Sequence, residues 1–374
     1  KIRELINTVN YTYKSGAHTM IIVDAHEDLA YNVLSDGRNY LQSAYQTRAE
    51  EEGGPVPELN GLCTLGLPEW LKGNVALVFG TLFTMPRQAA KPGEMGYPNP
   101  ESAHQQALAQ LNIYRRWAAG HPQITLVSQR LHLEQVLATW SDPAPVEKRQ
   151  VGLVLLMENA APIRTPDEAG WWYEQGVRLI GPAWRANRYS GSSDEQGPLT
   201  ELGRQLLAVM EQHRIVLDLS HMSDSACLEA LATYSGPIVA THSGLRRLVP
   251  TDRLLPDEIV AKLVARDGVV GIMPANWALD PDWRQGNDKK NVKLKAAVRT
   301  IDAVCQLAGD AHHVGIGTDF DGGFGAEAIP AELDTIGDLP RLVEVLAQHG
   351  YSQADIEAIM GGNWLRLLRQ ALPD

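Results

Sequence analysis

A histidine and an aspartate two residues apart follow an apolar, β-branched run near the start of the chain. The run is Ile21-Ile22-Val23-Asp24, and the pair is His26 and Asp28. Because residues two apart in a strand point to the same side, the imidazole and the carboxylate can reach a common point. Together they suit a divalent metal ion. One such pair is weak evidence for a metal site, so the prediction depends on whether similar residues occur elsewhere in the chain.

Four further side chains able to do chemistry each follow an apolar run of the kind that forms a buried strand. They are Glu158, His221, His242 and Asp319. Any one of them has a structural explanation: Glu158 as a helix cap, or either histidine as a buried ring hydrogen-bonded to backbone. Together with the first pair, however, they make six such residues at strand ends. We therefore predict that all six form one site.

The residue types in this set indicate the chemistry. Three imidazoles and two carboxylates, without a thiolate, suit Zn²⁺ or a similar divalent ion. Five ligands are too many for one catalytic zinc with an open position, but they fit two ions if Glu158 bridges them. A pair of ions about 3.5–4 Å apart can hold a bridging water or hydroxide and clamp a developing tetrahedral centre. Asp319 would then serve as general acid and base. One ion instead of two stays an alternative if Glu158 turns away.

The elements that must position these residues recur at regular intervals. Alternating apolar strands and helices predict a parallel sheet covered on both faces, and eight strands predict a (β/α)8 TIM-type barrel whose chemistry lies at the carboxyl ends of the strands. An open doubly wound sheet is the alternative, but the Gly-rich turn expected after its first strand is missing. The expected strands are Ile21–Asp24, Asn74–Phe83, Val151–Glu158, Val177–Trp184, Arg214–His221, Pro237–His242, Gly268–Ala275 and His313–Asp319.

One long polar stretch departs from this alternation. Residues 35–72, interrupted by Gly53-Gly54-Pro55, are predicted to be an insertion after the first strand, part loop and part short helix. A loop of this length often acts as a lid or a partner contact. We also expect a helix over Ser102–Ala119, an accessory strand over Ile124–Val127 and a closing helical segment over Gln353–Leu372. All of these would belong to one hydrolase domain spanning residues 1–374.

The composition limits the class of protein. The chain has 374 residues with 44% apolar and 21% charged residues, as in globular enzymes. A net charge of -12 without a basic cluster argues against nucleic-acid binding, and no apolar run approaches the about 18 residues of a membrane span. Cys63, Cys227 and Cys305 are expected to be structural thiols in a reducing compartment. We expect a soluble, cytoplasmic protein that acts on a small molecule. A periplasmic location stays open, because the chain lacks an initiator Met and could be trimmed.

Four motifs carry a resemblance to a known family. They are Asp24-Ala25-His26-Glu27-Asp28-Leu29, Leu217-Asp218-Leu219-Ser220-His221-Met222-Ser223, Thr241-His242-Ser243 and Gly315-Ile316-Gly317-Thr318-Asp319-Phe320-Asp321-Gly322. In this order they resemble the renal (membrane) dipeptidases, zinc-dependent, amidohydrolase-like enzymes built on a (β/α)8 barrel. The resemblance runs through most of the chain, and the last motif is the most specific. It implies hydrolysis of the amide bond of dipeptides by metal-bound hydroxide, and it hints at a homodimer.

The resemblance also implies individual roles. Asp319 would carry the proton, and Arg253 would hold the C-terminal carboxylate of the substrate through a planar, permanently charged guanidinium. Arg246 and Arg247 lie nearer His242 and stay candidates for this role. The implied metal ligands are His26 and Asp28 for one zinc ion, His221 and His242 for the other, and Glu158 as a bridge together with a water or hydroxide.

One position departs from the family pattern. After the fourth strand the family usually has a Thr-His pair whose histidine contacts the scissile group, but here Trp184 occupies that position. An indole donates one hydrogen bond and cannot become cationic near neutral pH. A donor aimed at a developing oxyanion is worth about 3 kcal/mol. Unless Arg185 or Asn187 takes over, we expect weaker dipeptidase activity or another amide or lactam as substrate. A non-catalytic binding barrel is a third hypothesis, disfavoured because the predicted ligand set is complete.

Overall fold

Eight parallel strands close into a barrel, which confirms the predicted (β/α)8 fold. The structure is a computed structural model that describes residues 14–15, 18–141 and 145–374. The hydrogen-bonded order of the ring is β4-β3-β11-β10-β9-β8-β7-β6, and β4 pairs with β6 to close it. The ring strands are β3 (Ile22–Glu27), β4 (Val75–Leu82), β6 (Val151–Met157), β7 (Val177–Ile180), β8 (Val216–Asp218), β9 (Ile238–Ser243), β10 (Val270–Ile272) and β11 (Val314–Ile316).

All eight predicted strands are present, but several end earlier than expected. β7 stops at Ile180 instead of Trp184, because Gly181 and Pro182 follow and proline has no N–H to donate to a neighbouring strand. β3 is different and continues to Glu27, beyond the expected end at Asp24. These ends decide where the polar residues emerge from the barrel.

In the described part of the chain, three further strands lie outside the ring. The predicted accessory strand is β5 (Ile124–Leu126), which pairs with the first half of β6 while β7 pairs with the second half. β5 therefore joins the sheet without opening the barrel. β1 (Lys14–Ser15) and β2 (His18–Thr19) form a separate antiparallel pair.

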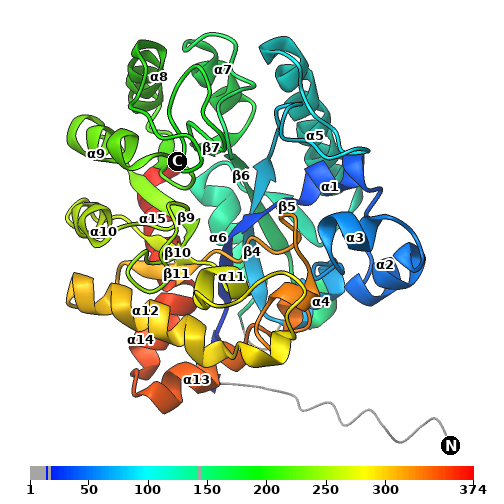
Figure 1. Ribbon diagram of the computed structural model, residues 1–374. Coiled ribbons are helices and arrows are strands. Elements are labelled where there is room, and N and C mark those ends of the chain that lie inside the picture. Colours follow the sequence, from blue (N-terminus) through cyan, green and yellow to red (C-terminus); the bar gives the residue numbers. More distant parts are fainter. Residues whose placement is uncertain (1–13, 16–17, 142–144) are drawn as a thin grey trace, which may run out of the picture.

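Helices cover the outside of the barrel, and Figure 1 shows α8, α9, α10 and α12 along one side of it. The sequence caps several of them: the Thr200 hydroxyl accepts from Gly203 N at the start of α8, and the Ser223 hydroxyl accepts from Ala226 N at the start of α9. The expected helix over Ser102–Ala119 lies within α5. Beyond the insertion, the helices are α5 (Pro100–Gly120), α6 (Arg130–Ala138), α7 (Glu168–Glu174), α8 (Glu201–Gln212), α9 (Asp224–Thr233), α10 (Asp257–Val264), α11 (Asn276–Leu279), α12 (Leu294–Ala308) and α13 (Arg341–His349), with 3-10 turns at Val146–Lys148, Lys289–Asn291, Ala326–Ala328 and Ile336–Asp338.

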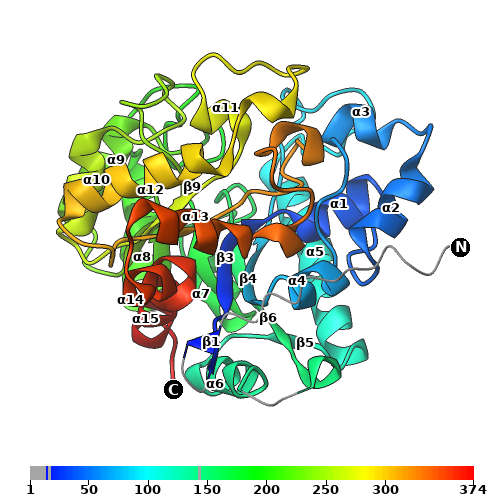
Figure 2. The same ribbon diagram turned by 90° about the horizontal axis from the view of Figure 1, so that it is seen from below.

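The C-terminal helical segment helps to fill the barrel. It comprises α14 (Gln353–Glu357), a π-helical stretch (Ala358–Gly362) and α15 (Asn363–Ala371), close to the expected range. Trp364 packs edge-on against Phe79, with ring centroids 5.5 Å apart, and donates its indole N–H to Ile316 O. Gly315 makes room for it, since a Cβ there would lie 2.2 Å from Trp364 Nε1. Figure 2 shows α14 and α15 beside the barrel.

The insertion after the first strand is more helical than expected. α1 (Leu29–Ser35) leads into α2 (Ala44–Glu51), α3 (Val56–Asn60) and α4 (Leu67–Lys72). The Ser43 hydroxyl caps α2, and a proline stands at the start of both α3 and α4, where its missing N–H costs nothing. Figures 1 and 2 both show α1 to α4 gathered on one side of the barrel.

Two further features bear on the sequence-based expectations. Among the described residues, no helix is both long enough and apolar enough to cross a membrane. Cys63, Cys227 and Cys305 are buried, free thiols, and burial raises the pKa of each above its ordinary value. Buried neutral thiols are poor nucleophiles, which agrees with a structural role.

Candidate active site at the carboxyl ends of the barrel strands

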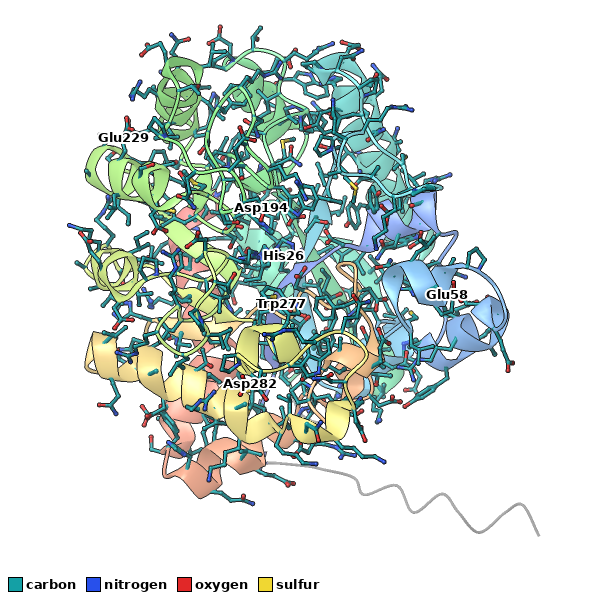
Figure 3. The ribbon with its side chains drawn as sticks, viewed as in Figure 1. His26, Glu58, Asp194, Glu229, Trp277 and Asp282 are labelled. Carbon is teal, nitrogen blue, oxygen red and sulfur yellow. The ribbon has the colours of Figure 1, made fainter. Side chains whose placement is uncertain are left out.

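The six residues predicted from strand ends come together in one place, which we call the polar cluster. Figure 3 shows His26 at the centre of the barrel, whereas Glu229 on α9 and Glu58 on α3 lie at its periphery. His221 is partly buried and the other five are buried. The cluster consists of His26 in β3, Asp28 just after β3, Glu158 just after β6, His221 after β8, His242 in β9 and Asp319 after β11.

Glu158 occupies the middle of the polar cluster. Its Oε1 lies 3.1 Å from His221 Nε2, 3.6 Å from His26 Nε2 and 3.7 Å from His242 Nε2. His221 Nε2 and His242 Nε2 are themselves 3.0 Å apart. One carboxylate oxygen therefore faces the imidazole nitrogens of histidines that lie in or just after three different strands.

Asp28 and Asp319 complete the cluster around His26. The distance from His26 Nε2 is 4.0 Å to Asp28 Oδ1 and 3.9 Å to Asp319 Oδ1. Asp28 is the N-cap residue before α1 but makes no capping hydrogen bond; its carboxylate instead accepts a hydrogen bond from the Thr81 hydroxyl. The side chain is thus turned toward the cluster and away from the helix.

Thr241 and Asp218 orient two of the histidines, and the residue pattern alone did not reveal this role. The Thr241 hydroxyl donates to Asp218 Oδ2 at 2.6 Å, so its oxygen accepts from His26 Nδ1 at 3.2 Å and from His242 Nδ1 at 3.0 Å. Both rings then carry their proton on Nδ1 and present a bare Nε2 lone pair to the cluster. A carboxylate behind a ligand histidine is the usual way in which a protein fixes this tautomer. The signal in the sequence was a polar residue in two of the motifs: Thr241, directly before His242, and Asp218, three residues before His221.

The polar cluster fits divalent metal ions. Within the described part of the chain, buried His26 Nε2 and Glu158 Oε2 have no hydrogen-bond partner. Buried polar atoms of this kind are costly unless something satisfies them. Ligand atoms within 4.8 Å of one another form overlapping groups: His26, Asp28 and Glu158; Glu158, His221 and His242; and His26, His242 and Asp319.

The pKa shifts of the cluster residues also favour a bound metal ion. Burial raises the pKa of Glu158 to about 8, and burial together with the charge of Glu158 raises the pKa of Asp28 to about 7. Burial also lowers the pKa of His221 and His242 well below the ordinary value. Carboxylates that resist ionisation beside neutral imidazoles are a favourable setting for a cation, because it would compensate the buried negative charge.

Arg253 is the arginine that the structure brings to the cluster. Arg253 lines the cavity that opens over the polar cluster. It donates from Nη2 to His242 O at 3.1 Å, and its buried Nη1 has no partner among the described residues. The two other candidates are engaged elsewhere: Arg246 pairs with Asp224 at 2.6 Å, and Arg247 pairs with Asp257 at 2.9 Å. Only Arg253 has a free guanidinium edge at the cavity among these three.

Trp184 forms an aromatic wall next to the cluster. Its ring centroid lies 5.1 Å from that of Phe83 and 6.2 Å from that of His221. Arg185 stacks over Trp184 at 5.4 Å and is half exposed, near Asp194. Asn187 is used inside its own loop, donating to Pro182 O and accepting from Tyr189 N. Trp184 lines the cavity over the cluster, whereas Arg185 and Asn187 are not among its lining residues.

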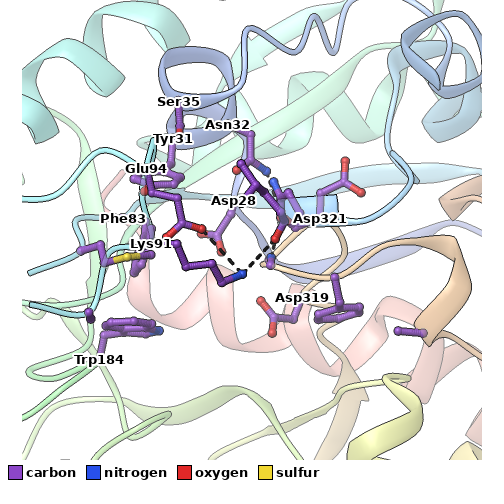
Figure 4. Close-up of a pocket in the computed structure, with 18 of the residues that line it drawn as sticks. Asp28, Tyr31, Asn32, Ser35, Phe83, Lys91, Glu94, Trp184, Asp319 and Asp321 are labelled. Carbon is purple, nitrogen blue, oxygen red and sulfur yellow. Dashed lines mark hydrogen bonds and ion pairs between the residues drawn. The ribbon is translucent and has the colours of Figure 1, made fainter. Parts of the chain in front are cut away.

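A cavity of about 540 Å³ opens over the cluster. Figure 4 shows Asp28 and Asp319 facing it, with Phe83 and Trp184 on one side and the Lys91 side chain between Asp28 and Trp184. Lys91 Nζ donates to Leu59 O at 3.0 Å and so connects the loop after β4 to α3 of the insertion. The volume is within the range of small-molecule sites, about 300–1,000 Å³. The insertion contributes to its wall, as expected, through Asp36, Leu59 and Asn60.

A parallel barrel with imidazoles and carboxylates gathered at its carboxyl end is the architecture of a metal-dependent hydrolase. The model of the membrane dipeptidase family (peptidase family M19) matches residues 14–372. The chain therefore belongs to this family, which confirms the resemblance seen in the sequence and the prediction of a metal-dependent peptidase.

Individual relatives agree with this assignment. The chain is 35% identical over 207 residues to an uncharacterized protein in the pqqA 5' region of Klebsiella pneumoniae, covering 53% of this chain and 73% of that protein. It is 29% identical over 209 residues to dipeptidase tcpJ of Claviceps purpurea, covering 53% of this chain but 46% of that protein. The crystal structure of dipeptidase AC, a metallopeptidase of family M19, has a TM-score of 0.77 at 24% identity, covering 95% of this chain and 99% of that one. That likeness concerns the fold.

Proposed function

We propose that the protein is a dinuclear zinc dipeptidase, which hydrolyses the amide bond of a dipeptide with a free C-terminal carboxylate. The position of Glu158 carries this proposal. Its Oε1 lies 3.6 Å from His26 Nε2 and 3.1 Å from His221 Nε2, so one carboxylate is close to a histidine of each predicted ligand pair. A carboxylate so placed is suited to bridge two ions. Membership of the dipeptidase family supports the substrate class.

The ligands divide naturally between two ions. His26 and Asp28 would hold one, His221 and His242 the other, and Glu158 belongs to both groups of ligand atoms. When bound, zinc ions supply a coordinated water of lowered pKa and polarise a carbonyl oxygen. The His26 and His242 rings are held for this task by Thr241, which fixes the Nε2 lone pairs toward the cluster.

Asp319 is placed to move the proton. It faces the cavity, and its Oδ1 lies 3.9 Å from His26 Nε2. Burial and the nearby charges of Asp28 and Glu158 raise the pKa of Asp319 well above the ordinary value. A carboxylate in this setting would accept a proton from the attacking water and return it to the leaving amine nitrogen, as a general base and then a general acid.

The first test is a dipeptide panel. The zinc-supplemented protein is assayed against dipeptides that vary in both residues and in the stereochemistry of the second one. Hydrolysis of at least one member by zinc-loaded protein, abolished by a chelator and restored by zinc, is the expected result. If no dipeptide is cleaved by protein that carries its metal, the dipeptidase proposal is wrong.

Arg253→Met should selectively weaken the binding of the C-terminal carboxylate. Hydrogen bonds to a charged group are worth about 1.5–3 kcal/mol, so KM for a dipeptide should rise about 10- to 100-fold. The preference for a dipeptide over its C-terminal amide, measured as a ratio of kcat/KM values, should disappear in the variant. Arg247→Met is the control, because this arginine is paired with Asp257. A retained preference in Arg253→Met would place the carboxylate elsewhere.

A second candidate function is hydrolysis of another amide or of a lactam, and Trp184 favours it. Trp184 stands at the position of the family histidine and has Phe83 5.1 Å away, so this side of the cavity is apolar. Trp184→His should raise kcat/KM for dipeptides up to about 100-fold if the missing donor limits turnover, since such donors are worth about 3 kcal/mol. Parallel assays with an N-acyl amino acid and a β-lactam identify the competing substrate class. Unchanged dipeptide turnover in Trp184→His would mean that other parts of the pocket set the specificity.

A further inference from the structure

The turn that carries Asp319 has a conformation that ordinary residues avoid. Asp319 has φ 56° and Asp321 has φ 61°, both in the left-handed region. Each non-glycine residue there costs about 1–2 kcal/mol, so the rest of the structure must hold the turn in place. The Asp319 carboxylate also lies against Gly322, where a Cβ would be 2.2 Å from Asp319 Oδ1. The position of this carboxylate therefore depends on the shape of the turn.

Asp321 anchors the turn through its fully buried carboxylate. Oδ1 accepts from Thr64 N at 2.8 Å and from the Thr64 hydroxyl at 2.6 Å. Oδ2 accepts from the Tyr40 hydroxyl at 3.0 Å and lies 3.1 Å from Arg38 Nη1. The Cys63 thiol is a further donor to Oδ2, at 3.3 Å. All of these donors come from the insertion, residues 35–72.

The backbone of the turn is held from the same side. Asn60 Oδ1 accepts from Gly323 N at 2.8 Å, and Asn32 Nδ2, in α1 just before the insertion, donates to Asp321 O at 2.8 Å. The barrel itself also contacts the turn, through a hydrogen bond from Asp319 N to His26 O at 3.1 Å and a parallel β-bridge between Glu27 and Phe320. Arg38 also bonds Glu51 and Gly61 O, which ties the anchoring residues to one another within the insertion.

We propose that the insertion is part of the catalytic apparatus: Thr64, Tyr40 and Arg38 act through Asp321 as positioning residues that hold the Asp319 turn. The role of Asp319 in this inference rests on the proposed function. The contacts of Thr64, Tyr40 and Arg38 with Asp321, which we call the clamp, do not depend on that function. The insertion therefore does more than line the cavity, since it fixes the proton-carrying side chain relative to His26. The positive charge of Arg38 compensates the negative charge of Asp321, which offsets the free-energy cost of burying this carboxylate.

The test uses isosteric changes in the zinc-loaded chain of 374 residues. Thr64→Val removes one donor to Asp321 without changing the shape, Tyr40→Phe removes another, and Thr64→Ser keeps the hydroxyl. Thr47→Val is the matched control, because Thr47 is a buried threonine of the same insertion whose hydroxyl accepts from Gln42. The readouts are kcat and KM for a dipeptide, bound zinc, and hydrogen–deuterium exchange of peptides covering residues 319–323.

Thr64→Val and Tyr40→Phe are expected to lower kcat about 10- to 100-fold, since a displacement near 1 Å of a catalytic group has effects of this size. KM and bound zinc should stay close to wild type, and amide exchange at 319–323 should become faster. Thr64→Ser and Thr47→Val should behave like wild type in all four readouts. Equal losses of kcat in Thr47→Val and Thr64→Val would overturn the proposal. So would an unchanged rate of amide exchange at 319–323 in Thr64→Val. If wild-type protein cleaves no dipeptide, the proposed function fails by itself, and the exchange measurement still decides the clamp.

Discussion

Asp319→Asn is expected to lower kcat about 10²- to 10⁴-fold, the usual contribution of a positioned general acid and base. The amide has nearly the same shape as the carboxylate but cannot take up a proton from the attacking water. Bound zinc and KM should change little, because the five remaining members of the polar cluster are the proposed ligands. Steady-state kinetics on the best dipeptide, with metal analysis of the same preparation, measures this.

Asp194→Asn is the matched control for the loss of a carboxylate at this cavity. Asp194 also lines the cavity, but its side chain is half exposed and lies 3.8 Å from Arg185. Exposed ion pairs contribute little, so kcat should stay within about twofold of wild type. Undiminished turnover in Asp319→Asn would remove Asp319 from the mechanism and leave proton transfer to another group.

Glu158→Gln should lose both metal and activity. Zinc should fall from about two equivalents per chain to one or fewer, because a neutral amide binds zinc weakly and the bridge between the ligand pairs is gone. Substitutions that merely disturb the orientation of a ligand cost about 10- to 100-fold, so the loss of turnover should exceed this. Metal content is measured by mass spectrometry after zinc-supplemented purification and desalting.

The metal count also separates the remaining hypotheses. Two equivalents in wild type and fewer in Glu158→Gln support the bridged pair, whereas one equivalent in both proteins indicates a single-ion site that does not depend on Glu158. Wild-type protein that retains no zinc would favour a binding barrel without catalysis. Glu94→Gln is a suitable control, since Glu94 lines the same cavity but contacts Lys91 and not the polar cluster.

The pattern of apolar runs was sufficient to predict the barrel and the position of most of the polar cluster. Strands such as β6 are apolar over their whole length because both faces are buried, and the residue that follows, Glu158, stands out against that background. Strand ends were less predictable. Trp184 was expected at the end of a strand, but Gly181-Pro182 ends β7 at Ile180 and places Trp184 in the following loop. Local backbone chemistry, and not hydrophobicity, set that boundary.

Roles that depend on pairing between distant segments could not be predicted in this way. Asp218 and Thr241 belong to the motifs of His221 and His242, but their joint effect appears only when β8 and β9 are adjacent and Thr241 N donates to Asp218 Oδ1 at 2.9 Å. Asp321 likewise belonged to the most specific motif without a role of its own. Its partners Thr64 and Tyr40 lie in a stretch that the sequence identified only as a polar insertion.

The sequence alone determined which residue types were available and that each would emerge at a strand end, because period and burial are properties of short segments. Only the closed barrel decided that these ends meet. Asp319 N donates to His26 O at 3.1 Å although the two residues lie far apart in the sequence, and no local pattern encodes that distance. Ring closure fixes the register between first and last strands, and with it the separations on which metal binding depends. The insertion shows the same principle, since its contacts with Asp321 exist only after α1 to α4 have packed against the barrel.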